Sequence, residues 1–170
     1  MTIATHSTTL EKTICAIQAL DLTPIKFKTT RNEDGYGWSA DYADKMALAY
    51  KRYLILHAKY PEMTLAPEQD IDRFWHMHIL DTRKYAADCE ATFGHFVHHF
   101  PYLGLRGEED AKALEAAFVK MHQLYAQEFG EPVPALQRDA AYCAAETDVQ
   151  SKAAYCAVEH AAAADIRLAA

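Results

Sequence analysis

Residues 39–60 read SADYADKMALAYKRYLILHAKY and decide the fold class of this chain. Ser39 is a typical helix N-cap, and Pro61 cannot continue a helix, so a helix is predicted between them, ending at about Tyr60. Apolar and aromatic side chains recur in it every three or four residues, which places them on one face. A stripe of this kind forms a helical core far more often than a cofactor site. Its members are Tyr42, Met46, Ala49, Tyr53, Leu56 and Tyr60.

Helical patterns also flank this segment. A capping box at Thr8 and Glu11 predicts a helix near the N-terminus, and Pro67 suits the first turn of a helix that runs to about Phe93. A further helix is expected over residues 108–129, with Gly130 as its cap. Residues 22–37 are interrupted by proline and glycine and are expected to form an extended loop. The expected fold is all-α, a four- or five-helix bundle.

The C-terminal part differs in composition from the rest. Residues 131–134, Glu-Pro-Val-Pro, are expected to link a helical domain at 1–130 to a tail at 135–170. The tail holds 14 alanines, and AAYCAAE at 140–146 recurs as AAYCAVE at 153–159. Alanine favours helix, so we expect an Ala/Tyr/Cys-rich helical extension that packs its tyrosines and cysteines inward. A second metal site or a modified tail is the alternative.

Composition narrows the possible functions. The 170 residues carry a net charge of −7, and no dense Lys/Arg patch occurs, so neither nucleic acid nor an anionic membrane is an expected partner. No apolar run approaches the ~18–20 residues of a membrane span, and the N-terminus lacks the pattern of a signal peptide. Four scattered cysteines without a CxxC pair do not suggest a disulfide framework. A cytoplasmic protein is expected.

Residues 72–107 carry the side chains most suited to chemistry. They contain five of the nine histidines, together with Cys89 and several carboxylates. Imidazole, thiolate and carboxylate are the groups that bind transition metals. His57 and His122 stand beside apolar stripes and are expected to be packing residues. The alternatives for the cluster are a hydrogen-bonded polar core or an acid/base histidine that acts without metal.

Helical geometry limits how this cluster can bind one ion. His76 and His78 point about 200° apart on a regular helix, so they cannot face the same ion. Asp72 shares a face with His76, whereas Asp81 is adjacent to His78. Gly94 allows the chain to turn back after the helix. A plausible site therefore joins His76 or His78, with one of the two carboxylates, to His98 and His99.

Two segments also carry a family resemblance: FWHMHILDTRKYAADC at 74–89 and FGHFVHHFPYLGLRGEED at 93–110. They closely resemble the small bacterial glycine-rich-domain-containing-protein-like family, whose pattern is WHxHxLDTxxYxxDC followed by HHxPY. The resemblance runs from about Leu20 to Gly130. It implies a motif of functional character without a settled reaction, and it ranks His95 below His98 and His99, because the pattern leaves that position open.

These observations favour a metal-dependent enzyme that uses iron or zinc in oxidative or hydrolytic chemistry on a small-molecule or peptide substrate. The expected ligands are His76, His78, His98, His99 and Asp72. Three further residues are candidates for catalysis or for lining the pocket: Asp81, Tyr85 and Cys89. The alternative function is a non-catalytic helical scaffold with a structural metal site or a polar histidine core.

Overall fold

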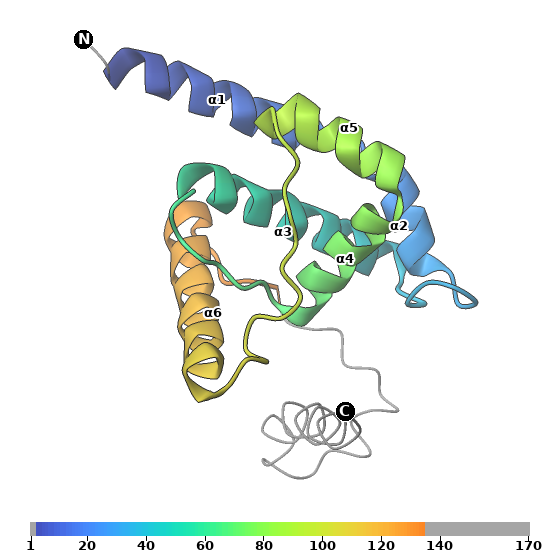
Figure 1. Ribbon diagram of the computed structural model, residues 1–170. Helices are drawn as coiled ribbons and strands as arrows, with labels where there is room; N and C mark the ends of the chain where they lie inside the picture. The colour runs from blue at the N-terminus through green and yellow to red at the C-terminus, as the bar shows by residue number, and fades with distance from the viewer. Residues whose placement is uncertain (1–2, 135–170) are drawn as a thin grey trace. The chain divides into compact units, whose positions relative to one another are not determined.

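Residues 3–134 are the part of the chain that the computed structural model describes, and they form six helices without a strand (Figure 1). The all-α prediction is therefore confirmed. None of these helices is long and apolar enough to cross a bilayer. The helices are α1 (Ile3–Ala19), α2 (Thr23–Thr30), α3 (Ala40–Lys59), α4 (Gln69–Leu80), α5 (Thr82–Phe93) and α6 (Glu108–Phe129).

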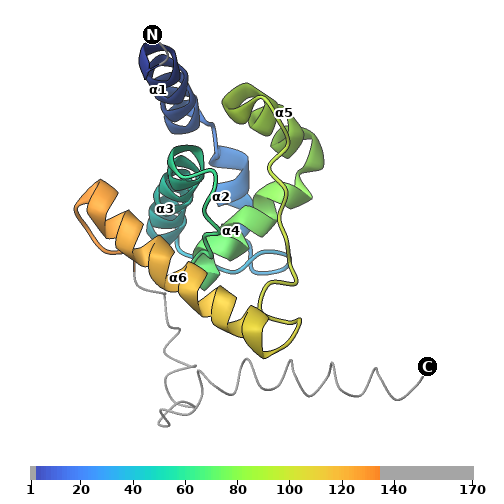
Figure 2. The same cartoon turned by 60° about the vertical axis from the view of Figure 1, so that its left-hand side comes forward.

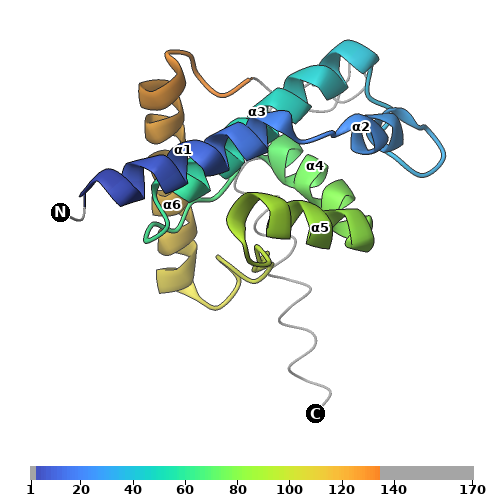
Figure 3. The ribbon, with the colours of Figure 1, turned by 90° about the horizontal axis from the view of Figure 1, so that it is seen from above.

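Helix α3 is the centre of the fold, because it contacts α1, α2, α4 and α6. The Ser39 hydroxyl accepts a hydrogen bond from the Tyr42 amide at 3.2 Å, so the predicted N-cap begins this helix. The predicted stripe is buried except for Tyr60, which is half-buried. Helix α6 packs on α3 (Figure 2), and α1 contacts both α3 and α5 (Figure 3).

The expected loop at 22–37 is wrong for its first half, where α2 forms. Pro24 lies in the first turn, where its missing N–H costs nothing, and the helix buries Ile25 and Thr29 against the core. The glycines that suggested a loop come after the helix end. Gly37 has a φ of 64°, so it turns the chain toward α3 in a conformation that favours glycine.

The long helix expected over 67–93 is divided in two at Asp81. This residue leaves helical geometry, with φ −82° and ψ 70°, and its carboxylate accepts a hydrogen bond from the Lys84 amide at 3.4 Å. Asp81 thus ends α4 and caps α5. The break allows α5 to pack back against α4, as well as against α1. Gly94 ends α5 in the left-handed conformation, φ 71°.

The first and last helices can be compared with the helix bounds expected from the sequence. Helix α1 begins at Ile3, so the capping box at Thr8 does not start it. Helix α6 has the predicted bounds and ends at Gly130 in the left-handed conformation. Residues 131–134 follow without a helix, and Val133 is buried in the helical core. The tail predicted at 135–170 lies outside the described residues.

Candidate metal centre

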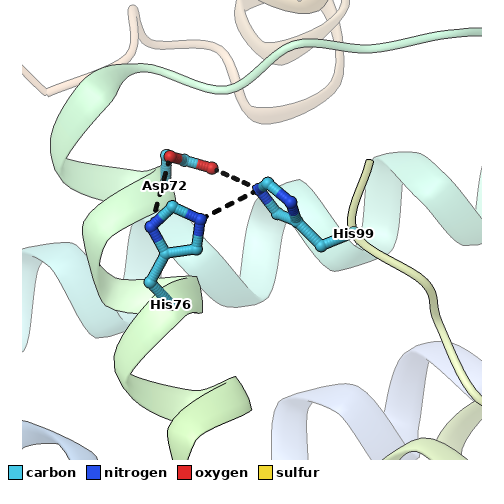
Figure 4. A group of neighbouring side chains, drawn as sticks. All are labelled: Asp72, His76 and His99. Atoms are coloured by element: carbon cyan, nitrogen blue, oxygen red, sulfur yellow. Dashed lines mark hydrogen bonds and ion pairs between the residues drawn. The ribbon is translucent and has the colours of Figure 1, made fainter. Parts of the chain in front are cut away.

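Three of the candidate ligands meet at one point of the structure (Figure 4): Asp72, His76 and His99. Nε2 of His99 lies 3.0 Å from Oδ1 of Asp72 and 3.1 Å from Nε2 of His76. Nδ1 of His76 lies 3.6 Å from Oδ2 of Asp72. Each residue can offer one ligand atom, and the three atoms lie within 4.8 Å of one another. The group is therefore compact enough to surround one ion.

Two different elements supply these side chains. Asp72 and His76 are four residues apart on α4, which puts them on the same helix face one turn apart. His99 comes from the connection between α5 and α6, which brings it to α4 (Figure 4). The side chains of Asp72, His76 and His99 are 31%, 45% and 17% exposed. The group thus lies at the surface and solvent reaches it.

The spacing of the atoms agrees with the dimensions of a metal site. Metal–ligand bonds to imidazole and carboxylate are about 2.0–2.2 Å long, so two ligands of one ion lie about 3.0 Å apart at right angles and about 3.4 Å apart in a tetrahedron. The two separations from Nε2 of His99, 3.0 Å and 3.1 Å, are close to the right-angle value and are also typical of hydrogen bonds. The atoms are therefore near enough to one another to share an ion.

His78 lies apart from this group and belongs to the core. Its Nδ1 lies 3.1 Å from the Tyr50 hydroxyl, and its Nε2 lies 3.0 Å from Oδ2 of Asp88. Burial lowers the pKa of His78, although the neighbouring Asp88 carboxylate opposes that shift. Both ring nitrogens already have partners, so this imidazole joins α4 to α3 and α5. It is outside the Asp72, His76 and His99 group.

The two histidines nearest to His99 in the sequence are also outside the group. His98 is exposed, and its ring contacts Phe96 at a centroid distance of 5.0 Å. His95 is exposed, and its Nδ1 lies 3.0 Å from the Phe93 carbonyl oxygen. Of the three histidines in this connection, only His99 belongs to the group formed by the described residues.

The three candidate catalytic residues, Asp81, Tyr85 and Cys89, lie outside the group of Asp72, His76 and His99. Asp81 is exposed at the break between α4 and α5. Tyr85 is buried on α5, where its hydroxyl accepts a hydrogen bond from Nε1 of Trp75 at 2.9 Å and donates one to the Val97 carbonyl at 2.5 Å. Cys89 is buried one turn further along α5. The sequence pattern does not reveal the roles of Trp75 and Asp88, which hydrogen-bond to Tyr85 and His78, although both residues stand in WHxHxLDTxxYxxDC.

A separate cavity of about 340 Å³ lies beside His57, at the C-terminal end of α3. Nε2 of His57 is buried without a hydrogen-bond partner among the described residues, and the Tyr53 ring meets the imidazole edge-on at 4.6 Å. Burial lowers the pKa of His57 from its usual 6.5 to about 4. The predicted packing role agrees with this burial. The cavity is lined by Thr9, Leu10, Thr13, His57, Ala58, Pro61, Phe93, His95 and Val97.

The fold and the site define an all-helical protein with a histidine–carboxylate group between one helix and a neighbouring connection. The family model described as UCP032817-like matches residues 16–128, well over half of the chain. The chain belongs to this family, and the match includes all three members of the group. No curated protein and no solved structure matches the chain.

Proposed function

We propose that this protein binds a divalent transition metal, iron or zinc, through Asp72, His76 and His99. The observation that carries the proposal is the convergence of one carboxylate and two imidazoles from two elements on a single point. A carboxylate and two imidazoles form the donor set of non-haem iron(II) oxygenases, and catalytic zinc sites use two histidines and a carboxylate as well. Copper(I) suits it less, because copper(I) prefers sulfur ligands.

We further propose that the metal is catalytic. A structural zinc site is closed by four protein ligands, whereas a catalytic site keeps at least one position for water or substrate. The described residues bring together three possible ligands, and the exposure of His76 would leave a bound ion open to solvent. Oxidative chemistry with iron and hydrolytic chemistry with zinc both need such a position. The substrate class remains the one expected from the sequence, a small molecule or a peptide.

The resemblance to the glycine-rich-domain-containing-protein-like family implies a motif of functional character, which is compatible with this proposal. His76 stands in the WHxHxLDTxxYxxDC pattern and His99 in the HHxPY pattern, whereas Asp72 lies two residues before the first segment. Four other motif residues make hydrogen bonds that join α4 to α5: His78 lies 3.0 Å from Asp88, and Trp75 donates to Tyr85. We therefore propose that the motif supplies two of the three ligands together with residues that hold α4 and α5 against each other.

Metal content measured by ICP-MS tests the binding. Untagged protein is reconstituted with zinc, and separately with iron(II) without oxygen, and is then freed of unbound metal. We expect near-stoichiometric metal in the wild type and in His98→Ala, and loss of metal in His99→Ala. His98→Ala is a matched control, because it removes the adjacent histidine, which is exposed and outside the group. Equal loss in both variants, or no metal in the wild type, contradicts the proposal.

A second experiment tests whether the bound metal keeps an open coordination position. Cobalt(II) replaces zinc in many sites, and its visible absorption reports the ligands and their number. Azide added to the cobalt-loaded wild type should change this spectrum with a saturable dependence on concentration, because azide enters an open position. A spectrum that does not respond to azide would favour the scaffold function with a closed structural site.

A further inference from the structure

We infer that Tyr85 and Trp75 are positioning residues of the metal centre, which hold the chain segment that carries His99 against α4. This inference rests on the proposed function, because it assigns the support of the same site. Neither residue belongs to the group of three possible ligands. Their effect on a metal would pass through the backbone at Val97 and through the ring of His99.

The contacts form a continuous path from α5 to the ligand. The Tyr85 hydroxyl donates to the carbonyl of Val97 at 2.5 Å, two residues before His99. The same oxygen accepts from Nε1 of Trp75 at 2.9 Å. The Trp75 ring then meets the His99 ring edge-on, with centroids 4.7 Å apart. Because Trp75 is adjacent to His76 on α4, the path connects both imidazoles of the group to one tyrosine.

The segment at 95–101 needs such support, because its own backbone provides little. It belongs to no helix and makes no backbone–backbone hydrogen bond to the residues that the structure describes. Ordering each residue of a loop costs about 1–2 kcal/mol of conformational entropy. The Tyr85 hydrogen bond offsets part of that cost before a metal arrives. His99 is then already placed 3.0 Å from the carboxylate of Asp72.

The Tyr85 hydroxyl is well suited to this task. Tyr85 is 2% exposed and Trp75 is 4% exposed, so water does not compete strongly for the two hydrogen bonds. Burial raises the pKa of Tyr85, so the hydroxyl keeps its proton and remains a donor to the Val97 carbonyl. Removing the hydroxyl leaves both the carbonyl and the Trp75 N–H without this partner.

The test compares two variants that each lose one buried tyrosine hydroxyl. Tyr85→Phe removes the bond to Val97, whereas Tyr53→Phe removes an equivalent buried bond to the Leu65 carbonyl, at 2.9 Å. Tyr53 also contacts the Trp75 ring, with centroids 5.7 Å apart. Tyr53→Phe is therefore a control in the same region of the core. Each protein is titrated with cobalt(II), and its visible spectrum is recorded. Zinc affinity is then measured by competition with a chelator.

We expect Tyr85→Phe to bind both metals about tenfold more weakly, the size typical for residues that support a ligand. Its cobalt spectrum at saturation should also differ from that of the wild type, because His99 is less well placed. Tyr53→Phe should keep the wild-type affinity and spectrum. Equal affinity and identical spectra in the two variants would overturn the positioning role and leave the metal centre intact.

Two further outcomes are also decisive. A wild type that binds neither cobalt nor zinc refutes the proposed function, and the positioning role with it. If Tyr85→Phe does not fold, Trp75→Phe takes its place, because it removes the N–H donor to Tyr85 and alters the contact with His99. Wild-type affinity in a folded Trp75→Phe variant overturns the inference in the same way.

Discussion

Acid should destabilise this fold through His57, the histidine at the C-terminal end of α3. Its Nε2 is buried without a hydrogen-bond partner among the described residues, so no described protein group would stabilise the imidazolium at that nitrogen. Burial therefore lowers the pKa of His57 from 6.5 to about 4. The unfolded chain keeps the usual value, so it binds more protons than the folded chain between these two pH values.

The sign and size of the effect follow from that difference in pKa. Since the folded pKa is lowered, the contribution of His57 to stability is fully present above about pH 6.5 and is lost as the pH falls toward 4. A difference of this size corresponds to about 3 kcal/mol in the free energy of unfolding. About 2 kcal/mol of it should disappear between pH 7 and pH 5.

The assay is urea unfolding at several pH values between 5 and 8, for the wild type and for His57→Leu. Other groups titrate in both proteins, so the difference between the two curves isolates His57. We expect the wild type to lose about 2 kcal/mol more than His57→Leu between pH 7 and pH 5. His57→Gln, which also lacks a titrating group, should show the same weaker pH dependence as His57→Leu.

A parallel pH dependence in the wild type and both variants would refute this reasoning. It would mean that the folded His57 binds a proton as readily as the unfolded chain does. The imidazole would then have water or a polar partner in the cavity at the end of α3, and burial would not control its charge.

Three further predictions concern a close packing contact, a buried hydrogen bond and the metal. Gly104 has a φ of 91°, and a Cβ there would lie 2.5 Å from Cδ2 of Leu114, so Gly104→Ala should lower the free energy of unfolding by about 1–3 kcal/mol, measured in urea. Tyr42→Phe should cost about 2 kcal/mol in the same assay, because the buried carboxylate of Asp70 loses a hydrogen bond of 2.6 Å. Free zinc at a hundred times its dissociation constant should stabilise the wild type by about 2.7 kcal/mol, and a His99→Ala variant of confirmed fold should show no such gain.

The helical fold could be predicted largely from local patterns. The stripe over 42–60, with Ser39 before it and Pro61 after it, predicts the central helix to within a residue. The break at Asp81 could not be predicted, because apolar residues continue at helical spacing on both sides of it. The packing of α5 against α4 and α1, together with the Asp81 cap, accompanies the division into two helices.

The sequence limits the number of candidate ligands, but it does not determine which of them meet in space. Helical geometry separates His76 from His78, yet the choice between them depends on which face of α4 meets α3 and α5 and which remains at the surface. His78 faces Tyr50 and Asp88, and these residues occupy its two nitrogens. The choice between His98 and His99 depends on the path of an irregular connection, which the local pattern does not determine.

The central claim is that one ion binds between Asp72, His76 and His99. Anomalous diffraction from crystals of the zinc-loaded protein, recorded on both sides of the zinc absorption edge, tests it most directly. We predict a peak about 2.0–2.2 Å from one oxygen of Asp72 and one nitrogen of each histidine. A zinc peak at His78 or His98, or no ordered peak at these three residues, would contradict it.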